Sequence, residues 1–127
     1  MYIEVTVSKR KKGVINMMFR PLVYVAGRFQ NEPRNQRKIE RCIKELIKLD
    51  EDVIFFSPVT AFGFLYEVED YEIGLNKCLQ MLSLASAMVI VKDGYQESTG
   101  VKAEMQYCKE HKIPMYFYDK GALELIK

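Results

Sequence analysis

Cysteine and histidine are scarce in this chain of 127 residues, which has three cysteines and one histidine. The cysteine count is odd and no Cys-x-x-Cys pair occurs, so the sequence excludes a disulfide framework and the common zinc motifs. Cys42, Cys78 and Cys108 each fall at an apolar position of a helical pattern, which predicts three core thiols in a reducing cytoplasm. The lone His111, expected in the last turn of a helix, gives no support to a Ser-His-Asp triad.

Long hydrophobic runs and an excess of one charge are also missing. No stretch approaches the roughly 18 apolar residues that a membrane span needs, and the longest runs, such as 85–91, have the length of a strand. The basic run at 9–12 is followed by too short an apolar segment for a signal peptide. A net charge of +2, from 19 basic and 17 acidic residues, is too balanced to predict binding to a nucleic acid polymer or a membrane.

The composition is that of one globular domain, with 49% hydrophobic and 28% charged residues. We assign residues 19–127 to this domain and residues 1–18 to an N-terminal extension. One hypothesis is that the extension is translated leader and that Met17 or Met18 is the true start, because a Lys-Gly-Val triplet shortly before them fits a ribosome-binding sequence. The rival interpretation is an edge strand over 2–7 followed by a basic loop, and a nucleic-acid-binding arm is a weaker third.

Strand and helix signals alternate from residue 21 onward. Apolar runs predict strands over 21–27, 53–58, 87–92 and 114–118. Helical periodicity predicts helices over 35–49, 70–84 and 99–112, with Asn35 and Asp70 as N-caps. We interpret 59–68 as an aromatic loop with room for one helical turn, and 121–127 as a short closing helix. This order predicts an α/β fold with three layers, in which helices flank a flavodoxin-like or Rossmann-like parallel sheet of four or five strands.

Parallel sheets bind ligands at the carboxyl ends of their strands, which directs attention to the loops 27–33 and 93–100. The second loop opens into the helix that starts near Thr99, and helix N-termini favour phosphate and other anions. Ser98 or Thr99 would donate to such an anion. The alternative is that they only cap the helix.

Glu104 is the residue on this helix that can carry chemistry. At 100° per residue, Val101, Met105 and Cys108 cluster within about 60°, and Glu104 lies roughly 40° beyond that buried face. A carboxylate at this rim, one turn into the helix, would be partly buried beside the ligand crevice and available as a nucleophile or base. The alternative is a solvated helix glutamate.

Three segments together resemble a known family. The segment 23–29 reads Val-Tyr-Val-Ala-Gly-Arg-Phe, and 94–104 contains a Ser-x-Gly-x-x-x-Glu spacing. With Ile-Pro-Met-Tyr at 113–116, they are similar to the nucleoside 2-deoxyribosyltransferase superfamily, in particular to its small, largely uncharacterised DUF4406-type branch of bacteria and phages. The resemblance covers about residues 21–118.

The resemblance implies a mechanism. Glu104 matches the family's nucleophile, which attacks the anomeric carbon of a 2′-deoxynucleoside and forms a deoxyribosyl ester that another base or water resolves. Tyr24 matches a strand tyrosine near that nucleophile. Ser98 and Gly100 match residues that contact a 5′-phosphate in the nucleotide-hydrolysing branch.

The remaining implied contacts come from the two loops. Gly27, Arg28 and Phe29 would line the base or sugar pocket, with Arg28 in the place of the usual proline. Tyr95 replaces a tryptophan and keeps an aromatic platform. The family works without metal or organic cofactor and assembles as dimers or larger, so the resemblance implies a homodimer that binds a nucleoside or nucleotide.

The sequence also departs from the family. The usual aspartate before the third strand is absent from Ala-Ser-Ala at 85–87, and Asn76, Lys77 and Gln80 stand where the preceding helix often has another. The alternative to an enzyme is therefore a non-catalytic module that binds a nucleotide, and a scaffold protein is a third possibility. The aromatic residues Phe62, Phe64 and Tyr66 fit a cover over a base as well as a core or subunit interface.

Overall fold

The computed structural model describes residues 20–127, so the N-terminal extension, with its hypothetical starts and expected strand, lies outside the described residues. The elements are β1 (Leu22–Ala26), α1 (Pro33–Leu49), β2 (Ile54–Phe56), α2 (Pro58–Phe62), η3 (Gly63–Leu65), α3 (Tyr71–Leu82), β3 (Ala87–Val91), η4 (Tyr95–Glu97), α4 (Thr99–His111), β4 (Met115–Asp119) and β5 (Ala122–Ile126). The four expected strands and three long helices are all present.

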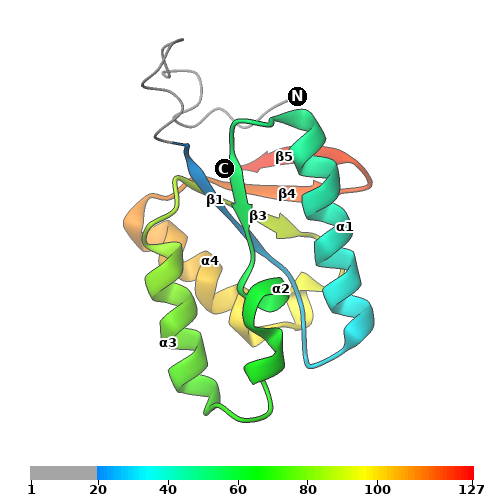
Figure 1. Ribbon diagram of the computed structural model, residues 1–127. Coiled ribbons are helices and arrows are strands. Elements are labelled where there is room, and N and C mark those ends of the chain that lie inside the picture. The colour runs from blue at the N-terminus through cyan, green and yellow to red at the C-terminus, as the bar shows by residue number, and fades with distance from the viewer. Residues whose placement is uncertain (1–19) are drawn as a thin grey trace.

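One five-stranded sheet with the strand order β2-β1-β3-β4-β5 forms the middle layer. The first four strands are parallel, and helix α1 covers one face while α3 and α4 cover the other (Figure 1). This arrangement confirms the predicted three-layer α/β fold with flavodoxin-like strand order. It follows from right-handed crossovers, which carry α1 over one face of the sheet and α3 and α4 over the other.

The expected closing helix at the C-terminus is wrong, because residues 122–126 form strand β5 antiparallel to β4. Lys120 and Gly121 both have positive φ, 50° and 84°, as the two central residues of a tight hairpin turn require. Two sequence signals indicate this hairpin. One is the glycine in the turn, and the other is the alternation of the apolar residues Leu123 and Leu125 with a charged residue between them. The sheet is therefore parallel, as predicted, except for this edge strand.

The helix starts differ in part from expectation. Helix α1 begins at Pro33 and not at Asn35, because proline is favoured in a first helical turn. Asn35 is no N-cap: its side chain is buried and donates to the carbonyl of Phe29 at 3.0 Å. Asp70 does cap α3, accepting from the backbone N–H groups of Glu72 and Ile73. The expected aromatic loop contains α2 and η3, more helix than the single turn allowed for it.

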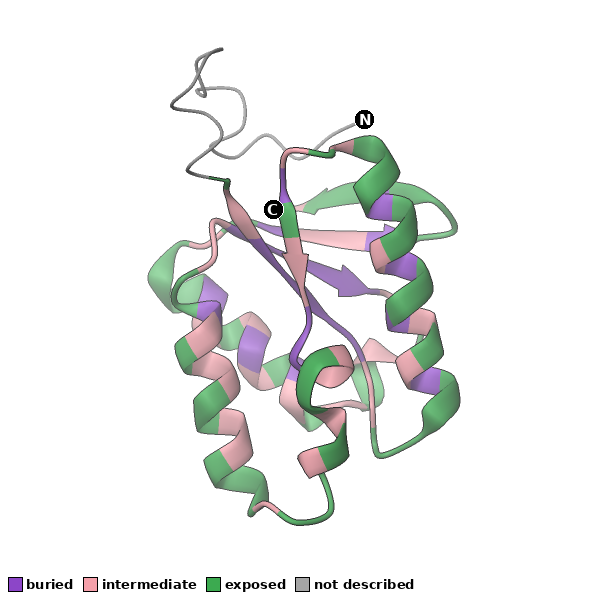
Figure 2. Ribbon diagram, viewed as in Figure 1, coloured by how far each residue is buried: buried purple, intermediate pink, exposed green. Residues whose placement is uncertain are grey.

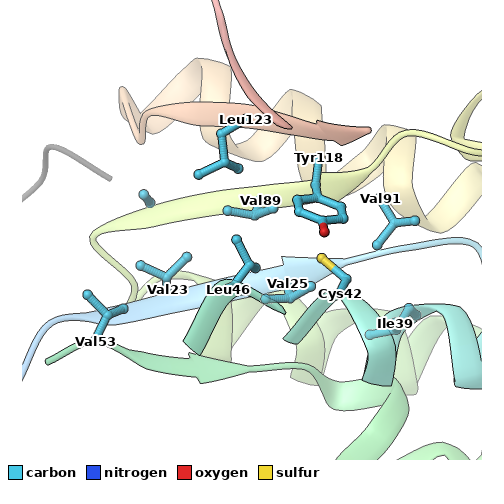
Figure 3. Packing of buried hydrophobic residues seen from close by; sticks show 11 residues of the cluster. Val23, Val25, Ile39, Cys42, Leu46, Val53, Val89, Val91, Tyr118 and Leu123 are labelled. Atoms are coloured by element: carbon cyan, nitrogen blue, oxygen red, sulfur yellow. The ribbon is translucent and has the colours of Figure 1, made fainter. Parts of the chain in front are cut away.

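The core has two halves, one on each face of the sheet, and the central strand β3 is buried throughout (Figure 2). Beneath α1, Ile39, Cys42 and Leu46 pack on the valines of β1 and β3 (Figure 3). Tyr118 points from β4 into the same half, with its hydroxyl facing Cys42 (Figure 3). The other half holds Tyr24 of β1 with Val101 and Cys108 of α4. Cys42 and Cys108 are thus core thiols, as predicted.

Candidate functional site

The loops that follow β1 and β3 meet at the carboxyl edge of the sheet. Arg28 forms an ion pair with Glu97 at 2.8 Å, and the Gln30 side chain donates to the Glu97 carbonyl at 3.1 Å. The two strands are neighbours, and the chain reverses its direction of travel across the sheet between them. Doubly wound sheets bind ligands at this switch point. The structure therefore brings together the two loops that the sequence marked.

Tyr24 and Glu104 form a hydrogen-bonded pair next to this edge. Tyr24 lies in the middle of β1 and is fully buried, and its hydroxyl donates to Oε2 of Glu104 in α4. The Glu104 residue is only 8% exposed, so it is more deeply buried than its predicted position at the rim of the helix face. The pair consists of the two candidate catalytic residues of the sequence analysis. It joins β1, one of the two strands at the switch point, to α4, the helix that follows the other strand.

Burial controls the protonation of this pair. Removal from water raises the pKa of Glu104 to about 7, while the hydrogen bond from Tyr24 acts in the opposite direction. Burial and the neighbouring carboxylate both raise the pKa of Tyr24, so the tyrosine keeps its proton and remains a donor. Near neutral pH the site thus holds a carboxyl group that exchanges readily between its acid and base forms, which suits a nucleophile or a general base.

Cys78 of α3 is the third member of this cluster. Its thiol lies close enough to Tyr24 and Glu104 to interact electrostatically with both. Cys78 is half-buried, in contrast to Cys42 and Cys108. Helical periodicity assigned it to the core, and packing against the core is also what the structure has. Its neighbours Tyr24 and Glu104 belong to a distant strand and a distant helix, so no local signal could have revealed this proximity.

The first turn of α4 holds the predicted anion-binding residues. Ser98 is the N-cap, and its Oγ accepts from the backbone N–H of Val101 at 3.1 Å, so the capping role is present. Thr99 Oγ1 lies 2.9 Å from the hydroxyl of Tyr71, which links the starts of α3 and α4. Gly100 faces the same hydroxyl, since a Cβ built there would lie 3.4 Å from it. Gly100 is one turn before Glu104, so the predicted anion site and the carboxyl are neighbours on one helix.

Gly27 and Arg28 have structural partners. A Cβ at Gly27 would come within 2.8 Å of the Ile39 side chain, so this glycine allows α1 to pack against the end of β1. The Arg28 side chain lies across Gly94, whose φ of 78° is the left-handed conformation that glycine adopts without strain. The guanidinium is engaged by Glu97. These contacts hold the two loops in place at the switch point.

Phe29 and Tyr95, the two aromatic residues predicted to contact the substrate, lie in different surroundings. Phe29 packs edge-to-face on Tyr66, with ring centroids 5.3 Å apart, and lines a cavity. The ring of Tyr95 lies 4.8 Å from that of Phe117 and packs against the core half that contains Tyr24 and Glu104. Tyr95 is therefore part of the wall of the core, and Phe29 is the residue of the two that borders an open space.

That cavity has a volume of about 190 Å³ and lies between the start of α1 and the α2–η3 segment. Phe29 and Phe64 supply aromatic surface, while Asn31, Gln36 and Thr60 supply amide and hydroxyl groups. Its lining includes neither Tyr24 nor Glu104. The sequence analysis named Phe29, and Phe64 as one of several loop aromatics. It missed the other lining residues, because they come from two separate segments, 29–36 and 60–64, and form no motif.

An aromatic path connects Tyr24 with the α2 segment. The ring of Phe56 at the end of β2 lies 6.4 Å from Tyr24 and 6.4 Å from Phe62, both in edge-to-face geometry. The expected aromatic cover is largely exposed: Phe62 and Tyr66 are 46% exposed and Phe64 is 77% exposed. They belong to a set of exposed apolar residues between positions 62 and 73, which we call the apolar ridge: Phe62, Phe64, Tyr66, Val68, Tyr71 and Ile73.

Within residues 20–127, no group of three or more histidine, cysteine, aspartate or glutamate side chains is arranged to hold a metal ion. In the same part of the chain, no helix is both long and apolar enough to cross a bilayer.

Comparison with known proteins adds information about the fold. No family model matches the chain, and no curated protein matches it. A solved structure of a conserved protein from Enterococcus faecalis V583 is similar, with a TM-score of 0.63 and 16% sequence identity. The similarity covers 78% of this chain and 63% of the length of the other. At this identity the likeness supports the α/β fold alone.

Proposed function

We propose that this protein binds a nucleoside or nucleotide and cleaves or transfers its N-glycosidic bond, with Glu104 as the nucleophile. The observation that carries the proposal is the buried hydrogen bond from Tyr24 to Glu104, next to the switch point of the sheet. The sequence resemblance to nucleoside 2-deoxyribosyltransferases names the same two residues, and the pairing of side chains 80 positions apart supports it independently.

Tyr24 would orient the nucleophile. Its hydroxyl engages Oε2 of Glu104 and leaves Oε1 for attack on the anomeric carbon of the sugar. As the new C–O bond forms, the C–N bond breaks, and its electron pair leaves with the base, which takes a proton from water. Water or a second base then attacks the same carbon, the ester bond breaks, and Glu104 is released as a carboxylate. The absence of the family aspartates leaves this proton transfer to solvent.

The substrate contacts in this proposal come from the edge of the sheet. The start of α4 at Ser98 and Gly100 would face the 5′-phosphate, because helix N-termini attract anions. Phe29 and the amide groups of the adjoining cavity offer an aromatic face and hydrogen-bonding groups to a base. Gly27 and Arg28 would form part of the pocket wall in the loop that follows β1. Tyr95 would support the pocket through its ring contact with Phe117.

The test is release of free base, measured by chromatography after incubation with 2′-deoxynucleosides, their 5′-monophosphates and ribonucleotides, with and without an acceptor base. The proposal predicts release from at least one substrate and loss of release in Glu104→Ala. Glu110→Gln is the matched control, since Glu110 is an exposed glutamate on the same helix. Release by Glu104→Ala at the wild-type rate contradicts the assignment of the nucleophile.

A second candidate is a nucleotide-binding module without catalysis. The separation of the cavity from Glu104 favours it, because the cavity is lined by neither member of the buried pair. A ligand in the cavity would then bind without reaching the carboxyl group. This alternative predicts that a nucleotide raises the melting temperature equally in the wild type and in Glu104→Gln, with no base released.

We further propose that the protein is a homodimer. Six of the eleven large apolar residues that are exposed among residues 20–127 belong to the apolar ridge. Concentrated apolar surface is typical of a protein interface, and a second copy would cover it next to the site. Sedimentation of the wild type and of a Phe64→Glu, Val68→Glu variant tests this, since a monomeric wild type contradicts it. The three free thiols fit a protein of the reducing cytoplasm, which we propose as its location.

A further inference from the structure

Helix α1 carries a positive charge that the composition of the whole chain conceals. Its sequence contains six basic and two acidic residues, a net charge of +4, whereas the whole chain has a net charge of +2. The remainder of the chain is therefore slightly acidic. The balanced total, from which no binding to a nucleic acid polymer was expected, combines one basic helix with an acidic remainder, and it is the local charge that a partner meets.

Five of the six basic residues form a continuous stripe along α1. At 100° per residue they fall within about 80° of the helix circumference, centred about 150° from the buried residues Ile39, Cys42 and Leu46. All five are exposed on the outer face of the helix (Figure 2). At 1.5 Å per residue they extend over about 21 Å of the helix axis. We call this set the basic stripe, and its members are Arg34, Arg37, Arg41, Lys44 and Lys48.

The cations of the basic stripe are available to a partner. Within residues 20–127, none of their side chains forms a hydrogen bond or an ion pair, whereas Lys38, the sixth basic residue of α1, is engaged by Asp93. Glu40 and Glu45 border the stripe on its two sides without pairing with it. Like charges three and four residues apart on a helix repel each other, and an anion laid along the stripe would relieve this repulsion.

We propose that the basic stripe binds the phosphate backbone of a nucleic acid. A nucleic acid presents a negative charge at every step along its length, and the stripe covers the axial length of about six phosphates on one strand of B-DNA. Three of the five members are arginines, whose planar guanidinium groups bind phosphate oxygens in pairs. Because the stripe consists of cations alone, the binding is expected to be independent of base sequence.

An anionic membrane fits the same helix less well. A helix that lies on a bilayer buries an apolar face among the lipids, and its charged face stays in water. The apolar face of α1, with Ile39, Cys42 and Leu46, is packed against the sheet. It has no apolar surface left to insert beside the stripe, so a polyanion in solution is the favoured partner.

The experiment is a fluorescence anisotropy titration of labelled oligonucleotides of about 20 residues, single-stranded and duplex, with the full chain at several salt concentrations. The wild type is expected to bind both at about 50 mM salt. If all five cations engage phosphates, the logarithm of the association constant falls against the logarithm of salt concentration with a slope of about −4.5 for the duplex and about −3.5 for the single strand.

A charge reversal in the middle of the stripe separates the local effect from the bulk charge. Arg37→Glu, Arg41→Glu is expected to weaken binding about tenfold or more at the lowest salt concentration. Lys102→Glu, Lys109→Glu is the matched control, because it makes the same change of net charge at two exposed positions of α4, on the opposite face of the sheet (Figure 1). The control is expected to bind within about twofold of the wild type.

The inference is overturned if the wild type binds neither oligonucleotide, or if the two double variants weaken binding equally. Binding to vesicles of phosphatidylcholine and phosphatidylserine without binding to either oligonucleotide also overturns it and indicates a membrane partner. If the charge-reversed variant does not fold, Arg37→Gln, Arg41→Gln is expected to reduce the magnitude of the duplex slope by about 1.8, and an unchanged slope is the contradicting result. No nucleoside is cleaved in these titrations, so their outcome is independent of the proposed function.

Discussion

The hydroxyl of Tyr24 donates a hydrogen bond to Oε2 of Glu104, which joins the middle of β1 to the second turn of α4. Because both residues are buried, the hydrogen bond is the main compensation for removing the carboxyl from water. The same burial gives Glu104 a pKa of about 7, so a group that destabilises the fold when ionised is also the one suited to chemistry near neutral pH.

Removal of the Tyr24 hydroxyl tests the hydrogen bond itself. Tyr24→Phe leaves the buried Glu104 carboxyl without its donor, so we expect the free energy of unfolding to fall by about 1–3 kcal/mol at pH 8. The loss is expected to be smaller at pH 5, where the carboxyl is protonated and the hydrogen bond is weaker. Urea denaturation at the two pH values measures both. An equal loss at pH 5 and pH 8 would argue that the hydroxyl does not serve the ionised carboxyl.

Tyr118 provides the opposite case on the other face of the sheet. Its hydroxyl is buried and has no hydrogen-bond partner among the described residues. Tyr118→Phe removes this unsatisfied group and keeps the ring that packs in the core beneath α1, so stability is expected to stay the same or to rise by up to about 1–2 kcal/mol. Denaturation of this variant beside Tyr24→Phe makes the comparison. A loss of stability as large as that of Tyr24→Phe would contradict the conclusion that the Tyr118 hydroxyl is unsatisfied.

The pH dependence of stability reports on Glu104. Its pKa is about 7 in the folded protein against an ordinary value of 4.5, so the folded state binds the proton more tightly. This contribution to stability is complete below pH 4.5 and is lost as the pH rises through 7, by about 3 kcal/mol in total. Glu104→Gln does not titrate, so the wild type is expected to lose stability relative to this variant between pH 5 and pH 8.

The same ionisation is expected to have the opposite effect on activity. Release of base requires the carboxylate, so kcat/KM is predicted to rise with pH through about 7 while the stability difference falls. Denaturation curves and rates measured on the same samples compare the two midpoints. A stability difference that does not vary with pH contradicts the burial of an ionisable Glu104.

Gly27 tests the packing of the β1 loop. An added Cβ would lie 2.8 Å from Cγ1 and 2.9 Å from Cδ1 of Ile39, so Gly27→Ala is expected to cost about 1–3 kcal/mol. Ile39→Ala removes both atoms, and the double variant is expected to lose less stability than the sum of the two single variants. Thermal or urea denaturation of the four proteins completes the cycle. Additive losses would show that the two positions do not interact.

The fold was predictable largely because its signals are local. The apolar runs and the helical periods are each contained in one segment, and the order of the elements then leaves few topologies. The strand β5 was missed because the apolar residues in 122–126 fit both a short helix and an edge strand, and the deciding signal is the turn at Lys120 and Gly121. Helix α1 begins two residues before its predicted start, because a proline in the first turn of a helix has no intrahelical hydrogen bond to lose.

The site was predictable only in part. Periodicity placed Glu104 at the edge of a buried face, and only the resemblance joined it to Tyr24, since nothing in the spacing links a strand residue to one 80 positions later. The fold brings Cys78 close to Tyr24 and Glu104, and it separately brings together the polar residues of the cavity. Neither set of residues lies within one short segment of the sequence. Ser98 is the reverse case, because its position before a helix was sufficient to predict the cap that the structure has.

The most direct test of the central claim is to locate the covalent intermediate. The protein would be mixed with the 2′-deoxynucleoside or nucleotide that releases base, quenched in acid and digested, and the peptides analysed by mass spectrometry. The account predicts a deoxyribosyl ester on the peptide that contains Glu104, and no such adduct in Glu104→Gln. An adduct on a different residue, or base release by Glu104→Gln at the wild-type rate, would contradict it.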